Sequence, residues 1–189
     1  MIIIYGGAFN PPTKAHYLIA KKIIDRFNPD SFYFLPVGSR YNKKGMADYE
    51  SRFNMTKIMA DKFKSAIVSR KENEESFRGT YYALKDFSLI DNDLYFVMGA
   101  DNFDYLDKWI MADKLIEEFK FIIITRKGYD VSELIKEKYN NNKDNFTILE
   151  IDFPISSTDF RENKNKEILL DEVYEYIKTN NLYEVNENV

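Results

Sequence analysis

Short apolar runs alternate along the chain with segments whose apolar residues recur at helical spacing. Continuous runs of this kind are typical of strands that are buried on both faces of a parallel sheet. They occupy residues 2–5, 32–37, 66–68, 94–98, 121–125 and 147–151. The alternation predicts an α/β fold of Rossmann-like type, with a doubly wound, mostly parallel sheet and helices on both of its faces.

Helical spacing predicts helices close to residues 14–27, 50–64, 80–89, 131–139 and 166–178, and a helical region from about 100 to 115. The apolar positions of the second helix predict an inner face of Phe53, Ile58, Met59 and Phe63. We expect a solvated turn at 71–76 (KENEES) and a surface loop at 140–145 (NNNKDN). No internal repeat or linker interrupts the pattern, so residues 1–189 are expected to form one domain.

Three unusual polar loops follow predicted strands, and ligands of such sheets bind beyond the carboxyl ends of the strands. The first is GGAFNPPTKAH at 6–16, where two glycines permit close backbone approach and Thr13 is a candidate N-cap. The helix that begins there presents unpaired N–H groups to an anion. His16 lies in its first turn and is the single histidine of the chain. The loop therefore predicts a phosphate site, although it lacks the spacing of a P-loop, and a capped tight turn with an incidental histidine is the alternative.

The second loop is ISSTDFR at 155–161, which combines hydroxyl groups with an arginine. If Ser157 or Thr158 caps a short helix, Arg161 lies about one turn further on and can bind phosphate through two hydrogen bonds. The alternative is an ordinary N-cap beside a solvated arginine.

The third loop is GADN at 99–102, followed by the single tryptophan, Trp109. Asp101 comes directly after a strand, where it can accept a hydrogen bond from a ribose hydroxyl. Trp109 can stack on a flat ring, or it is a core residue of its helix. The basic loop SRYNKKG, with Lys43 and Lys44, covers a phosphate group or is simply solvated.

Composition narrows the chemistry. The chain has no cysteine, which excludes disulfides and thiolate metal sites, and a single histidine argues against a histidine-built zinc site. A net charge of −4 gives no general attraction to nucleic acid or membrane, and no apolar run is long enough to span a bilayer. We therefore expect a cytoplasmic protein with no nucleic-acid or membrane partner. The sequence leaves open whether it forms a homo-oligomer.

Taken together, these motifs resemble the nucleotidyltransferase superfamily, whose signatures are (H/T)-x-G-H after the first strand and ISST-x-x-R near the C-terminus. Within it the chain most resembles the nicotinate-nucleotide adenylyltransferases, through GGAFNPPTKAH, GADN with a following tryptophan, ITR at 124–126, ISSTDFR and the closing YIKTNNLY. Four differences from the family pattern stand out. Thr13 holds the first position of the four-residue motif in place of histidine, a variant that the superfamily uses, and Gly79-Thr80 matches only part of the family's Tyr-Thr segment. Ala15 takes the place of the usual glycine, and SRYNKKG stands where the family has Pro-His-Lys.

The resemblance implies transfer of AMP from ATP to the 5′-phosphate of nicotinate mononucleotide, giving deamido-NAD and pyrophosphate by direct in-line attack. It implies that His16, Thr13 and Arg161 are catalytic, and that Lys43 and Lys44 are phosphate-loop candidates. It also implies that Thr80 and Trp109 contact the nicotinate nucleotide. The ATP site that it implies consists of Gly7, Ala8, Phe9, Gly99, Asp101, Arg126, Ser157 and Thr158. Mg²⁺ would enter with ATP, without a metal site built by the protein.

Other activities remain open at this point. An adenylyltransferase that acts on nicotinamide mononucleotide or phosphopantetheine has the same chemistry. A class I aminoacyl-tRNA synthetase is disfavoured by the short chain and by the lack of a KMSKS-like segment. A non-catalytic adenine-nucleotide-binding module belongs to a different class, and it would release no pyrophosphate.

Overall fold

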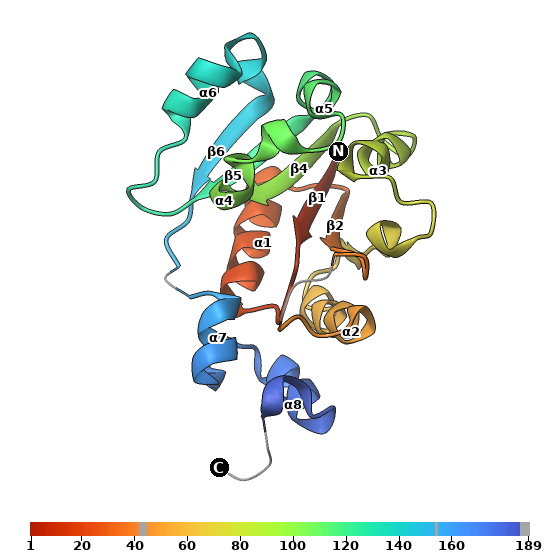
Figure 1. The fold of residues 1–189 in the computed structure, drawn as a ribbon, viewed down its shortest axis with the longest axis vertical. Coiled ribbons are helices and arrows are strands. Elements are labelled where there is room, and N and C mark those ends of the chain that lie inside the picture. Colours follow the sequence, from red (N-terminus) through yellow and green to blue (C-terminus); the bar gives the residue numbers. More distant parts are fainter. Residues whose placement is uncertain (42–44, 154, 186–189) are drawn as a thin grey trace.

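The computed structural model describes residues 1–41, 45–153 and 155–185. These residues contain a six-stranded sheet in the order β3-β2-β1-β4-β5-β6, and each pair of neighbouring strands is parallel (Figure 1). The strands are β1 (Ile2–Gly7), β2 (Ser31–Pro36), β3 (Ala66–Val68), β4 (Leu94–Gly99), β5 (Lys120–Thr125) and β6 (Phe146–Glu150). The predicted parallel α/β fold is confirmed.

Helices cover both faces of the sheet, and each face has its own apolar core. The bounds are α1 (Lys14–Phe27), α2 (Tyr49–Ala60), α3 (Thr80–Ser88), α4 (Ala100–Phe103), α5 (Ala112–Glu118), α6 (Ser132–Lys138), α7 (Ser157–Asn163) and α8 (Asp171–Thr179). On one face Ile23 of α1 and Met59 of α2 pack against β1 and β2. On the other, residues of α3, α5 and α6 pack against the opposite side chains of the same strands. Alternating strand residues therefore supply two cores, as the continuous apolar runs require.

The strand order places a topological switch point between β1 and β4. From β1 the chain moves outward to β2 and β3, and from β4 it moves the other way to β5 and β6. The loops after β1 and β4 therefore leave the sheet in different directions and open a crevice between them. The first and third sequence motifs follow these two strands.

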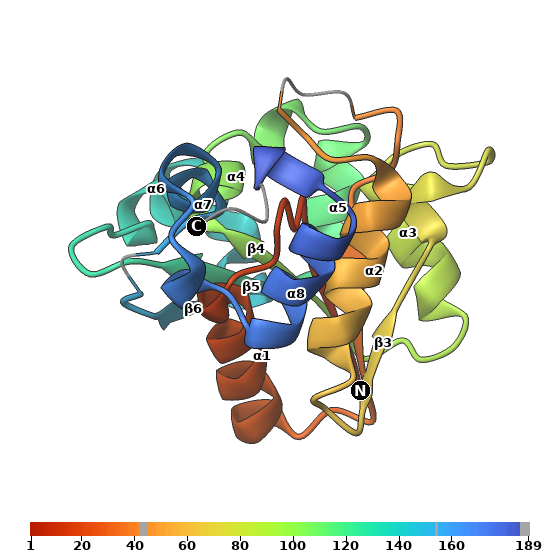
Figure 2. The same cartoon turned by 90° about the horizontal axis from the view of Figure 1, so that it is seen from below.

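The C-terminal part of the chain forms a third apolar cluster, at the end of the sheet toward which the strands run (Figure 1). Val173 and Ile177 of α8 pack with Met55 of α2, and Figure 2 shows the two helices side by side. Asn54 of α2 donates a hydrogen bond to the Tyr176 hydroxyl, 3.2 Å away. These contacts hold the C-terminal helices beside the crevice.

Several predicted elements differ in detail. The helix predicted over 50–64 ends at Ala60, and its buried face includes Arg52, Met55 and Thr56, whereas Phe53 is only partly buried. A prediction from apolar positions misses this face, because Arg52 is charged and Thr56 carries a hydroxyl. The predicted helical region 100–115 divides into α4, the 3₁₀ helix Leu106–Lys108 and α5. The predicted helix 166–178 divides into the 3₁₀ helix Lys166–Ile168 and α8. The predicted surface loop at 140–145 forms a 3₁₀ helix.

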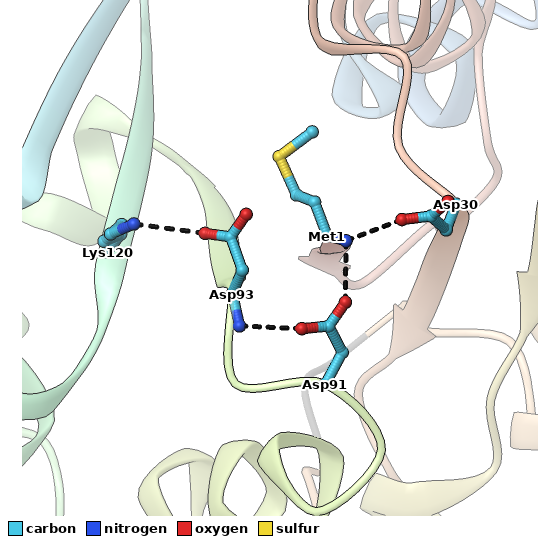
Figure 3. Close-up of polar contacts among 5 residues, drawn as sticks. All are labelled: Met1, Asp30, Asp91, Asp93 and Lys120. Atoms are coloured by element: carbon cyan, nitrogen blue, oxygen red, sulfur yellow. Dashed lines mark hydrogen bonds and ion pairs between the residues drawn. The ribbon is translucent and has the colours of Figure 1, made fainter.

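Ion pairs join the loops at the opposite end of the sheet, where the strands begin. The Met1 amino group lies 2.7 Å from a carboxylate oxygen of Asp30 and 2.6 Å from one of Asp91 (Figure 3). Lys120 pairs with Asp93 beside them, at 3.1 Å. The hydrogen bonds that the amino group donates to the two aspartates raise its pKa to about 10. The crevice and this charged cluster thus lie at opposite ends of the strands.

The described residues include no helix that is long and apolar enough to cross a membrane.

Candidate active site

Two cavities of about 560 Å³ each lie on either side of the loop that follows β1. The first cavity is lined by His16, by Gly99 and Asp101 after β4, by Arg126 after β5, and by Ser156 and Ser157 before and at the start of α7. The second cavity is lined by Gly6, Gly7 and Ala8, by Gly38 after β2, and by Thr80 and Trp109. The carboxyl ends of β1, β2, β4 and β5 thus contribute residues to the two cavities.

His16 is held in one orientation at the start of α1. The backbone N–H of Thr13 donates to Nδ1 of His16 over 3.0 Å, and the Thr13 hydroxyl lies 2.9 Å from the same nitrogen. Because Nδ1 accepts a hydrogen bond, the proton of the neutral ring is on Nε2. Burial lowers the pKa of His16 to about 4, so the ring is neutral at pH 7. His16 therefore offers one N–H donor to the first cavity.

Thr13 acts behind the histidine rather than in the cavity. It is fully buried and occupies the N-cap position of α1, as the sequence predicts. In the usual capping box the third helical residue is an acid that accepts from the N-cap N–H. Here His16 fills that place, so the cap of the helix and the orientation of the imidazole depend on the same hydrogen bond.

The buried side chain of Phe9 packs against the imidazole of His16. Phe9 is 1% exposed, its ring centroid lies 5.3 Å from that of His16, and its backbone has a positive φ of 46°. A Cβ on Gly7 would come within 3.1 Å of the Phe9 ring, so glycine leaves room for the aromatic side chain. The predicted contact of Phe9 with ATP stays untested, and the structure places its ring in the core.

The ISSTDFR segment docks on the first loop. Ser157 donates to the carbonyl of Pro11 over 2.8 Å, and Arg161 donates through Nη1 to the carbonyl of Asn10 over 2.8 Å and through Nη2 to Thr158 Oγ1 over 2.9 Å. Two motifs separated by about 140 residues along the chain are therefore adjacent in space. The Thr158 hydroxyl accepts from Arg161 and keeps its own proton for a ligand.

The cap of α7 is Ser156, one residue before the predicted position. Ser156 and Asp159 form a reciprocal capping box, with Ser156 N–H to Asp159 at 2.7 Å and Asp159 N–H to Ser156 Oγ at 3.2 Å. The hydrogen bonds from Ser156 lower the pKa of Asp159. Asp159 and the hydroxyls of Ser156 and Ser157 are thus engaged within the protein, which leaves the Thr158 hydroxyl and Arg161 as the groups suited to an anion.

Arg52 is a buried cation beneath the second cavity. It is 1% exposed, and its guanidinium donates to three backbone carbonyls: Ala47 at 3.0 Å, Ala8 at 3.0 Å and Val37 at 2.8 Å. The planar fork of arginine suits three separate acceptors. It fixes the backbone after β1 relative to the backbone after β2. Sequence reasoning missed this residue because a charged side chain in a helix suggests a solvated face.

One residue of the segment predicted as a solvated turn at 71–76, Glu72, lines the second cavity, whereas residues 74–76 are exposed. The segment begins with a 3₁₀ helix, Lys71–Asn73, and burial raises the pKa of Glu72 to about 7. A Cβ on Gly38 would come within 2.0 Å of the Glu72 carbonyl oxygen, so only glycine fits there. The expectation of a solvated turn is wrong for Glu72. The local sequence does not indicate that Glu72 is buried, because the backbone that packs against it is that of Gly38, 34 positions earlier.

Comparisons with known proteins show the family of the chain. The cytidylyltransferase-like family matches residues 4–163. A probable nicotinate-nucleotide adenylyltransferase of Acholeplasma laidlawii is 37% identical over 187 residues, covering 97% of this chain and 98% of the relative. One from Clostridium acetobutylicum is 33% identical, covering 95% and 97%. The structure of the nicotinic acid mononucleotide adenylyltransferase of Plasmodium falciparum, complexed with NaAD, matches with a TM-score of 0.81, 25% identity and 98% coverage of both chains.

The chain belongs to the nicotinate-nucleotide adenylyltransferase family. The resemblance seen in the motifs is confirmed, and the enzyme class with it: this is a nucleotidyltransferase of NAD biosynthesis. The family uses ATP, and the two cavities flank the loop that carries its signature histidine.

The predicted site residues of this adenylyltransferase fall into three groups. Those around the first cavity are His16, Gly99, Asp101, Arg126 and Ser157. Those around the second are Thr80 and Trp109, together with Gly7 and Ala8, which had been expected beside adenosine. Thr13, Phe9, Thr158 and Arg161 support or border these walls without lining either cavity. Lys43 and Lys44 lie outside the described residues.

Because this adenylyltransferase has a single histidine, its imidazole can be titrated by NMR without assignment. We expect the ring signals of the folded protein to titrate with a pKa of about 4 and to show the Nε2–H tautomer at pH 7. The protein unfolded in urea serves as the control, with a pKa near 6.5. A folded-state value near 6.5, or the Nδ1–H tautomer, would contradict the geometry described for Thr13 and His16.

Proposed function

We propose that this chain binds ATP in the first cavity and nicotinate mononucleotide in the second, and transfers AMP from ATP to the 5′-phosphate of the mononucleotide. The observation that carries the proposal is the position of His16, a neutral N–H donor at the start of α1 that lines the first cavity, while the glycines just before it in the first loop line the second. A triphosphate and an acceptor phosphate that approach from opposite sides of the loop after β1 meet next to this group. The products are deamido-NAD and pyrophosphate.

His16 would donate through Nε2 to an oxygen of the α-phosphate. The neutral ring suits this role, because its Nε2 already carries the proton that it donates in the hydrogen bond. The N-terminus of α1, a helix of 14 residues, adds unpaired N–H groups and the positive end of its dipole. These fixed donors stabilise the charge that develops on the α-phosphate during attack.

Leaving pyrophosphate would be stabilised on the α7 side of the first cavity. Arg161 and the Thr158 hydroxyl, which border this cavity, would supply the donors there, because the Ser157 proton is already used on Pro11. Asp101 and Arg126 would contact the adenosine part. The acceptor phosphate is anionic at neutral pH, so direct in-line attack needs no strong base, and catalysis rests on positioning and charge stabilisation.

Mg²⁺ fits this site as an ion carried by the substrate. The described residues bring together no group of three or more His, Asp or Glu side chains that could hold a metal. Mg²⁺ retains much of its water and binds readily through phosphate oxygens. When bound, it would neutralise charge on the β- and γ-phosphates. We also propose the cytoplasm as the location.

A nicotinate rather than a nicotinamide acceptor is favoured by α3. Its nine-residue helix begins at Thr80, which lines the second cavity, and it has no acidic residue in its first turn. The unpaired N–H groups at this end favour a carboxylate over a neutral amide. Trp109 borders the same cavity, with its ring edge-on to Phe96 at 6.2 Å, and a face of the indole can stack on a pyridine ring.

The direct test is pyrophosphate release from Mg-ATP with each acceptor in turn: nicotinate mononucleotide, nicotinamide mononucleotide and phosphopantetheine. We expect the largest kcat/KM with nicotinate mononucleotide. Turnover with phosphopantetheine alone would overturn the proposed acceptor and leave adenylyl transfer standing. Release of no pyrophosphate with any acceptor would instead support a non-catalytic nucleotide-binding module.

The role of His16 is tested by His16→Ala. We expect kcat to fall by about 10²–10³, the scale for the loss of one preorganised donor to a developing charge. His16→Gln is the matched variant, because its side-chain amide can place an N–H near the former Nε2 position and should recover part of the rate. An alanine variant that turns over like wild type would remove His16 from the mechanism.

A further inference from the structure

Asn10 joins three segments of the chain to the first loop. Its side-chain amide donates to the carbonyl of Gly45 over 3.1 Å, and its Oδ1 accepts from the Ala47 N–H at 3.0 Å. The same Oδ1 accepts from the Tyr183 hydroxyl at 2.6 Å. Its backbone carbonyl accepts from Arg161 at 2.8 Å. Asn10 is 5% exposed, so these bonds are made where water competes little.

Tyr183 reaches this position from the end of the chain. It lies in a 3₁₀ helix, Leu182–Glu184, that follows α8. Its ring stands edge-on to Phe160 of α7, with centroids 5.8 Å apart and an interplanar angle of 88°. Since Arg161 of α7 bonds the Asn10 carbonyl, the first loop, α7 and the C-terminal segment contact one another pairwise.

The backbone around Tyr183 is strained. Tyr183 and Glu184 have φ values of 56° and 57°, and Asn181 has 50°, in the left-handed region that L-residues with side chains disfavour. Such conformations persist where surrounding contacts require them, and they are common at functional sites. Here they direct the Tyr183 ring toward Asn10. Burial also raises the pKa of this hydroxyl, which therefore keeps its proton and donates it.

We infer that Tyr183 is a positioning residue for adenylyl transfer, which acts through Asn10 on the loop that carries His16 and on Arg161. The inference rests on the proposed function for its catalytic readout. Tyr183 itself lines neither cavity, so it acts without touching a substrate. It also lies beyond residue 163, where the match to the family model ends.

Tyr183→Phe tests this inference because it keeps the ring against Phe160 and removes only the hydroxyl. Asn10 then loses one of its hydrogen bonds, and the first loop samples more orientations. We expect kcat to fall about 10-fold, the effect of one lost hydrogen bond to a group that fixes reacting atoms, with little change in the KM for ATP. The thermal midpoint should change no more than in the control variant.

Tyr176→Phe is the matched control. It removes a hydroxyl that also joins the C-terminal region to another helix, through Asn54 of α2, at 3.2 Å. We expect its kcat to equal that of wild type. If Tyr183→Phe likewise leaves kcat unchanged, or if the two variants lose the same activity together with stability, the inference is overturned.

Two further measurements test the role of Tyr183 independently of the identity of the acceptor. In an Asn10→Ala background Tyr183→Phe should cause no further loss of kcat, because both changes break the same link. An additive loss would contradict action through Asn10. Amide hydrogen exchange of residues 8–16 needs no substrate, and we expect it to be faster in Tyr183→Phe than in Tyr176→Phe. Equal exchange would overturn the inference even if the acceptor proved to be different.

Discussion

The site depends on one hydrogen bond, from the Thr13 N–H to Nδ1 of His16. It satisfies an otherwise unpaired donor at the start of α1 and at the same time fixes which nitrogen of the ring carries the proton. Burial beside Phe9 lowers the pKa of the ring, so His16 stays neutral. In the proposed reaction, a donor of fixed direction at the α-phosphate stabilises the developing charge without reorganisation during attack.

Backbone carbonyls rather than carboxylates hold the surrounding loops. The Arg52 guanidinium bonds the carbonyls of Ala8, Val37 and Ala47, and the Arg161 guanidinium bonds the carbonyl of Asn10. Each cation is thereby fixed without full neutralisation by a paired acid. Positive charge remains next to both cavities, where it favours phosphate groups. In the proposed function, the two arginines that hold the loops also favour phosphate binding nearby.

The sequence predicted much of this arrangement, and the parts that it missed have a common cause. The apolar runs predicted the strands. Their alternation with helices predicted a parallel sheet whose functional loops lie beyond the carboxyl ends of the strands, where His16 and Asp101 are found. Arg52, Glu72 and Tyr183 were missed because their roles come from contacts between distant segments. A buried arginine that bonds carbonyls has no periodicity to detect. Gly7 and Ala8, predicted beside adenosine, line the second cavity. The sequence does not indicate which cavity a loop faces, because tertiary packing decides it.

The central claim is that the two substrates meet across the loop after β1, at His16. A crystal structure of the protein with a non-hydrolysable ATP analogue and nicotinate mononucleotide tests it most directly. The account predicts adenine near Asp101 and Arg126, the mononucleotide between Thr80 and Trp109, and an α-phosphate oxygen within hydrogen-bond distance of His16 Nε2. A triphosphate bound in the second cavity, or one out of reach of Nε2, would contradict it.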